Sequence, residues 1–121
     1  TNLAEFLAYP IRAVAAYLEM NTEFIISSTL KKDNALHGQD KVLAICKELE
    51  ATEYYNAIGG QQLYSKEDFA RQGIQLSFLD TRSIRYAQGS GEFQPNLSIL
   101  DVLMYNPKEQ VQEMLREYDL R

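Results

Sequence analysis

The chain has 121 residues, a formal net charge of −5 and a hydrophobic fraction of 45%, values typical of one globular domain with a modest core. An acidic surface repels phosphate backbones, and lysine and arginine are scattered along the chain, so nucleic acid and anionic membranes are poor candidates for partners. No apolar run approaches the ~18 residues that a membrane span needs, and a lone cysteine cannot form an internal disulfide, so we expect a cytoplasmic protein without membrane insertion.

The first twenty residues are predicted to be mostly helical. Apolar side chains recur there at helical spacing, from Leu3 and Phe6 to Leu18. Pro10 cannot donate a helical hydrogen bond and disfavours helical geometry at the residue before it. We therefore expect a kink or a restart of the helix at this proline.

Residues 23–60 have the pattern of a strand, a helix and a second strand. The short apolar run at residues 24–26 suits a strand buried on both faces, which we expect over residues 24–28. Residues 39–49 have the apolar spacing of one helix face, and Cys46 on that face is interpreted as a buried structural thiol. Residues 53–57 are predicted to be the second strand. Two strands joined through a helix form a parallel βαβ unit, and its strand ends are where α/β sheets bind ligands. Five residues fall there: Ser27, Ser28, Asn56, Gly59 and Gly60.

The second half of the chain continues the alternation. Ser65 followed by Asp68 is a capping box that starts a helix, and Gly73 is placed to end it. Residues 74–79 alternate as a third strand, and helices are predicted over residues 97–105 and 108–118. These elements predict a single α/β domain: a small three-layer arrangement in which a short, mainly parallel sheet of about three strands is flanked by helices.

Several positions carry candidate chemistry. The Gly59-Gly60 turn resembles a phosphate-binding helix entry but lacks a phosphate-loop spacing, so a plain tight turn is the better interpretation. His37, the only histidine, is either a general base or an exposed loop residue. The polar loop that contains it, residues 29–38, is either a substrate-facing lid or a disordered surface excursion. One histidine and one cysteine do not make a metal site, and the sequence predicts no cofactor.

Two further features admit both a structural and a functional interpretation. Ser98 and Asp101 have the capping-box spacing again, but Asp is a poor helix former in the middle of the predicted helix, which favours a functional role. Tyr64 and Tyr86 lie near predicted strand ends, where their rings either stack on a sugar or nucleotide or cover the edge of the core.

Four stretches together resemble the WbqC-like protein family. They are IISSTL at residues 25–30, KVLAICKELEATEYYNAIGGQQLY at 41–64, FARQGIQLSF at 69–78, and YAQ…FQPNLSILDVLMYN at 86–106. The positions that match the recurrent polar pattern of the family are Ser28, Tyr54, Gly60, Tyr64, Tyr86, Gln88, Ser98 and Asp101. Glu50 departs from the pattern, since the family usually has a glycine there that ends the helix in left-handed geometry, so we expect this helix end to differ.

The resemblance implies work in bacterial cell-surface polysaccharide clusters, including O-antigen biosynthesis. It suggests an acyl or amino-acyl transferase acting on a nucleotide-linked amino sugar, with Asp101 or His37 as base and the Gly59 and Gly60 amides as oxyanion donors. The alternatives are a non-catalytic sugar-binding or scaffold module of the same pathway, and a half-chain that is inert alone. Family members are about twice this length. The chain resembles their carboxyl-terminal half, so we expect the amino-terminal half to be a partner and Thr1 to be a cloning or cleavage boundary.

Overall fold

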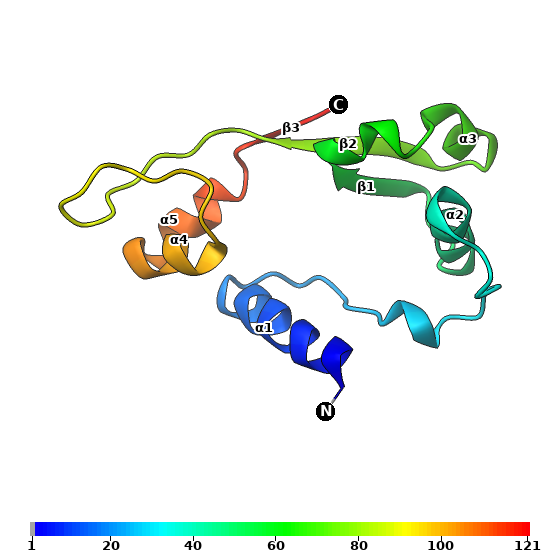
Figure 1. Cartoon of the computed structure of the whole chain (residues 1–121), viewed down its shortest axis with the longest axis horizontal. Coiled ribbons are helices and arrows are strands. Elements are labelled where there is room, and N and C mark those ends of the chain that lie inside the picture. The colour runs from blue at the N-terminus through cyan, green and yellow to red at the C-terminus, as the bar shows by residue number, and fades with distance from the viewer. Residues whose placement is uncertain (1) are drawn as a thin grey trace. The chain divides into compact units, whose positions relative to one another are not determined.

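The computed structural model of the chain describes residues 2–121, which form two compact units (Figure 1). The sheet unit comprises residues 25–81 and 118–121, and the helical unit comprises residues 2–24 and 82–117. The α/β class expected from the sequence is confirmed, because both helices and an open sheet are present.

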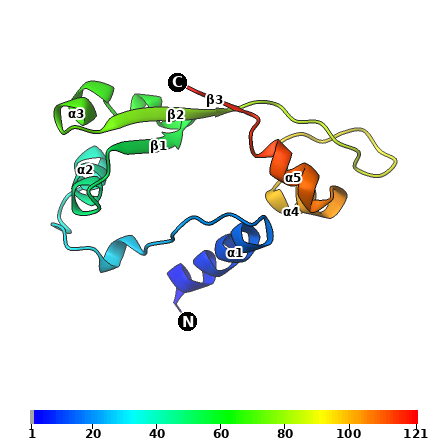
Figure 2. The same ribbon diagram turned by 180° about the vertical axis from the view of Figure 1, so that it is seen from behind.

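The sheet has three strands in the order β1-β2-β3: β1 (Glu53–Ala57), β2 (Gln75–Thr81) and β3 (Tyr118–Leu120). The first two strands pair in parallel, with Tyr54 opposite Leu76, as predicted for these two segments. The third strand pairs antiparallel to β2, with Asp119 opposite Asp80. Both views show β3 at the end of β2 (Figures 1 and 2). The sheet is therefore mixed rather than purely parallel.

The predicted strand at residues 24–28 is wrong. Residues 24–26 have no regular structure, and the 3-10 helix η1 (Ser27–Thr29) follows them. Phe24 and Ile25 are 39% and 44% exposed, whereas a strand covered on both faces would bury them. A strand also needs a hydrogen-bonding partner, and residues 24–28 take no part in the β1–β2 and β2–β3 pairings that make up the sheet. The parallel unit is thus β1–β2, connected through the 3-10 helix η2 (Ile58–Gln62) and the helix α3 (Lys66–Arg71), rather than a unit built on residues 23–60.

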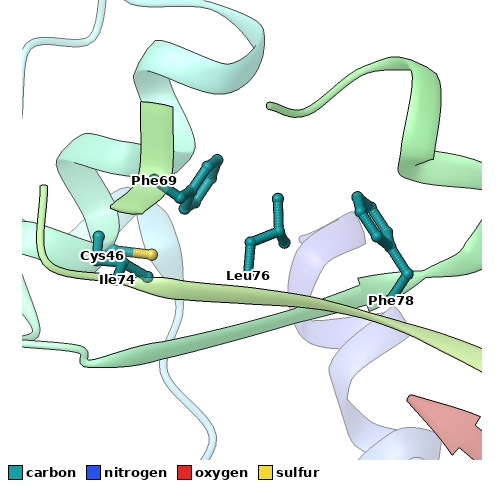
Figure 3. Packing of buried hydrophobic residues seen from close by; sticks show 5 residues of the cluster. All are labelled: Cys46, Phe69, Ile74, Leu76 and Phe78. Carbon is teal, nitrogen blue, oxygen red and sulfur yellow. The ribbon is translucent and has the colours of Figure 1, made fainter. Parts of the chain in front are cut away.

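The core of the sheet unit lies on one face of the sheet. Figure 3 shows the side chains of Leu76 and Phe78 rising from the same side of β2, with Phe69 of α3 on that side. Phe69 is completely buried, and the Tyr54 ring stacks on it with centroids 5.5 Å apart. Cys46, from helix α2 (Gly38–Glu48), is 4% exposed in the same cluster, which confirms its interpretation as a buried thiol.

A glutamine joins the start of α3 to α2. The Ser65 hydroxyl caps α3 by accepting from the Asp68 N–H at 3.3 Å, as the capping-box spacing predicts. The Asp68 carboxylate does not bond back to Ser65; it accepts from Gln39 Nε2 at 2.9 Å, and Gln39 Oε1 accepts the Ser65 N–H at 2.6 Å. The α2 side chain thereby completes the cap of the neighbouring helix.

Helices α2 and α3 end in the same left-handed geometry. Gly73 has φ +74°, and the N–H of Ile74 reaches back to the carbonyl of Phe69, which is the Schellman pattern expected at this glycine. Glu50, after α2, adopts φ +53° with the equivalent bond from Ala51, so the expected difference at this helix end is wrong. The tertiary contacts of Ala51 and Cys46 hold a non-glycine residue in geometry that glycine adopts more readily.

The helical unit consists of α1 (Leu3–Tyr17), α4 (Ile99–Tyr105) and α5 (Lys108–Met114), with Leu18, Val102 and Val111 buried between them. Helix α1 runs through Pro10 without a restart. Helix α5 is shorter than the predicted 108–118, because the chain leaves the helix after Met114 and Tyr118 joins β3.

Candidate functional site

Three polar side chains of the helical unit form a hydrogen-bonded cluster, which we call the Tyr86–Gln88–Asp101 cluster. The Tyr86 hydroxyl donates to Asp101 Oδ2 at 2.5 Å, and Gln88 Nε2 donates to the same oxygen at 2.8 Å. Gln88 Nε2 also lies 3.3 Å from the Tyr86 oxygen. The structure therefore brings together three of the predicted site residues from two segments of the chain.

Helix α4 positions the carboxylate of this cluster. Ser98 is the N-cap, and its hydroxyl accepts from the Leu100 N–H at 3.2 Å. Asp101 occupies the first turn of α4 rather than its middle, because the helix begins two residues later than predicted. A carboxylate is favourable near a helix N-terminus, so the argument that Asp is out of place here is wrong. The side chain nevertheless points to Tyr86 and Gln88 instead of closing a capping box on Ser98.

The hydrogen bond to Asp101 keeps the Tyr86 phenol protonated. That bond, with a smaller contribution from burial, raises the pKa of the Tyr86 phenol above its ordinary value, so Tyr86 is the proton donor of the pair. Because its proton points to Asp101, the phenol oxygen can only accept further hydrogen bonds. A ligand N–H or O–H is therefore the complementary group at Tyr86.

The loop that follows Gln88 lines an open hollow beside the cluster. The Gln88 side chain closes this loop, accepting from the Gln94 N–H at 2.7 Å and donating to the Gln94 carbonyl at 3.0 Å. The hollow has a volume of about 670 Å³ and is lined by Arg85, Tyr86, Gln88, Glu92 and Phe93 together with small residues. Sequence reasoning missed Arg85 and Phe93. The Gly89-Ser90-Gly91 turn, which folds Phe93 back toward Tyr86, was the signal that could have found them.

The remaining predicted residues belong to the sheet unit. Gly59 and Gly60 lie in η2 directly after β1, and Tyr64 follows them. Gly60 is buried so closely that an added Cβ would lie 2.9 Å from Asn56 Oδ1, and Asn56 in turn donates to the Tyr54 hydroxyl at 2.8 Å. The Tyr64 ring meets Tyr54 edge-on, with centroids 6.1 Å apart. Gly60 and Tyr64 thus have clear packing roles.

The other site residues predicted in the sheet unit, Ser27, Ser28 and His37, are exposed. Ser27 and Ser28 are exposed in η1. His37 is the exposed N-cap residue of α2, and its side chain makes no capping hydrogen bond. Within residues 2–121, no three His, Cys, Asp or Glu side chains are grouped so that they could hold a metal ion. Nor does that part of the chain contain a helix with the length and apolarity to cross a membrane.

The model of the WbqC-like protein family matches residues 1–113. The chain belongs to the WbqC-like family. No curated protein and no solved structure matches it. The matched region of this WbqC-like chain contains the whole Tyr86–Gln88–Asp101 cluster and the Tyr54, Gly60 and Tyr64 group, whereas β3 lies beyond it. Family membership, which the ordered motifs predicted, is thereby confirmed.

Proposed function

We propose that this WbqC-like chain works in the cytoplasm in the biosynthesis of bacterial cell-surface polysaccharide, including O-antigen. Its reaction is the transfer of an acyl or amino-acyl group to the amine of a nucleotide-linked amino sugar. The observation that supports this proposal is the 2.5 Å hydrogen bond between Tyr86 and Asp101 at the edge of an open, aromatic-lined hollow. The pair offers a carboxylate base and an acceptor oxygen to an incoming amine.

The sugar amine attacks the carbonyl carbon of an acyl thioester, a C–N bond forms, and the C–S bond breaks to release the thiol. The nitrogen loses one proton to the Tyr86 oxygen as the phenol proton of Tyr86 passes to Asp101. Asp101 then returns that proton to the departing thiolate through solvent. In this scheme Asp101 is the base and Tyr86 is the group that contacts the amine.

The roles assigned from the sequence to residues of the sheet unit stay separate predictions and are not part of the site at Tyr86 and Asp101. They are His37 as an alternative base, Gly59 and Gly60 as amide donors, and Ser27, Ser28 and Tyr64 as sugar contacts. Ser98 contributes by capping the helix that carries Asp101.

A non-catalytic sugar-binding or scaffold module of the same pathway is the second candidate function. One observation favours it: Gln88 and Asp101 Oδ2 are already engaged by partners within the chain. Such a satisfied network suits a rigid surface that recognises a ligand without reacting.

Incubation with UDP-glucosamine and acetyl coenzyme A, followed by mass spectrometry, tests the reaction. We expect an N-acetylated product whose formation falls at least about a hundredfold in Asp101→Asn and Tyr86→Phe, because general-base catalysis contributes 10²–10⁴-fold. Tyr9→Phe is the matched control, since Tyr9 is 76% exposed in α1. Saturable binding of UDP-glucosamine without product would support the module instead, and no binding would overturn both candidates.

A further inference from the structure

Arg85 and Phe93 form a small platform at the hollow beside the Tyr86–Gln88–Asp101 cluster. The guanidinium carbon of Arg85 lies 5.1 Å from the centroid of the Phe93 ring, which is a cation–π distance. The Phe93 ring meets Tyr86 edge-on, with centroids 5.2 Å apart and an interplanar angle of 80°. The Phe93 ring therefore contacts Arg85 on one side and Tyr86 on the other. Tyr86 in turn donates its hydrogen bond to Asp101.

The guanidinium of Arg85 has no carboxylate partner within residues 2–121. In that part of the chain, Arg71, Arg82 and Arg121 each pair with an acidic side chain, whereas Arg85 contacts the Phe93 ring. A guanidinium stacked on a ring keeps the N–H groups at its edge available, in the fork geometry that matches phosphate oxygens. Arg85 is thus held in place by a cation–π contact while its guanidinium has no ion-pair partner among the described residues.

The loop that carries Phe93 has a defined shape. Its two ends are joined by the paired hydrogen bonds between the Gln88 amide and the backbone of Gln94, and Gln88 is itself anchored to Asp101. Phe93 directly precedes this closure, so its ring is placed by the loop before any ligand arrives. A preformed site loses less conformational entropy when it binds a ligand.

We propose that Arg85 and Phe93 form the subsite for the diphosphate group of the nucleotide-linked sugar. This inference rests on the proposed function, because it assigns one end of the same ligand to a residue pair that no motif had indicated. Arg85 contacts the phosphate oxygens, and the Phe93 ring holds the guanidinium in register beside Tyr86, which receives the sugar amine. Glu92 also lines the hollow, and its carboxylate weakens the attraction of an anion.

Calorimetric titration of the protein with UDP-glucosamine tests this subsite. We expect Arg85→Ala to weaken binding by about tenfold or more, since a charge-assisted hydrogen bond is lost. Glu92→Gln should tighten binding, and inorganic pyrophosphate should compete with UDP-glucosamine in the wild-type protein. Arg116→Ala is the matched control, because it removes an exposed positive charge from the same unit outside the hollow. Thermal melts confirm that each variant is folded.

The outcomes separate this inference from the proposed function. Equal affinity of the wild type and Arg85→Ala for UDP-glucosamine, or no competition by pyrophosphate, would overturn the diphosphate subsite and leave the proposed function standing. If Arg116→Ala lost as much affinity as Arg85→Ala, the loss would be explained by the change in net charge alone. That result would also overturn the subsite. A wild-type protein that does not bind UDP-glucosamine would overturn both.

Discussion

Tyr86 donates a 2.5 Å hydrogen bond to Asp101, a residue fifteen positions later in the chain. This bond ties the irregular segment that precedes α4 to the first turn of that helix. Both residues lie within the part of the chain that the model of the WbqC-like family matches, residues 1–113.

The hydrogen bond between Tyr86 and Asp101 should be detectable as a raised pKa of Tyr86. The hydrogen bond to Asp101 raises the pKa of this phenol, so Tyr86 should remain protonated when exposed tyrosines ionise at about pH 10. A raised pKa in the folded state means that the stabilisation is complete below about pH 10 and is lost as the pH rises through the higher value. NMR titration of ring-labelled tyrosine, assigned with Tyr86→Phe, measures it. Asp101→Asn should lower the pKa of Tyr86, and ionisation of Tyr86 at the ordinary tyrosine value would contradict the prediction.

Asp101→Ala should also destabilise the fold. The substitution leaves the Tyr86 hydroxyl without its acceptor, breaks one bond of Gln88, and removes a carboxylate from the first turn of α4. We expect a loss of about 1–3 kcal/mol in the free energy of unfolding, measured by urea denaturation. Asp101→Asn, which retains an acceptor oxygen, should lose less. Unchanged stability in Asp101→Ala would show that the cluster does not support the fold.

Glu50→Gly should stabilise the chain. Glu50 holds φ +53° at the end of α2, a geometry that costs a non-glycine residue about 1–2 kcal/mol. Glycine removes this cost, but its greater freedom in the unfolded chain offsets part of the gain. We therefore expect the free energy of unfolding to rise by about 1 kcal/mol. Thermal unfolding measures it, with Glu50→Ala as a control that retains the strain. Glu19→Gly should gain less, because Glu19, at φ +60°, also pairs with Lys108 and Gln112.

Gly60→Ala should destabilise the sheet unit, whereas Gly59→Ala should not. A Cβ at residue 60 meets Asn56 Oδ1 at 2.9 Å, so Asn56 must shift and its bond to Tyr54 is disturbed. We expect a loss of about 1–3 kcal/mol. A Cβ at residue 59 meets nothing within 4 Å, so this variant is the matched control. Equal melting temperatures for the two variants would contradict the packing role of Gly60.

Cys46 should react slowly with a thiol probe under native conditions. Its side chain is 4% exposed against Phe69 and Ile74, and burial raises the pKa of the thiol, so little reactive thiolate is present. We expect labelling to be slow in buffer and to become rapid in denaturing urea. Fast stoichiometric labelling of the folded protein would show that α2 opens readily.

The sequence alone determined what depends on neighbouring residues. Helix α2, the cap of α3 at Ser65, its end at Gly73 and the strands β1 and β2 all follow from spacing and local hydrogen bonding within a few positions. Family membership likewise follows from ordered motifs along the chain. Burial of Cys46 was predictable too, because a helix places residues of one spacing on one face.

The tertiary structure decided what depends on distant partners. Residues 118–120 carry a pattern that also suits a helix, and they are extended because their backbone pairs with β2, about forty residues away in the chain. The apolar run at residues 24–26 has no such pairing and remains irregular. Asp101 likewise has the spacing of a capping residue, and only the fold brings Tyr86 and Gln88 to its carboxylate. A strand or a polar cluster is completed by groups that local spacing does not specify, and this is why the site required the structure.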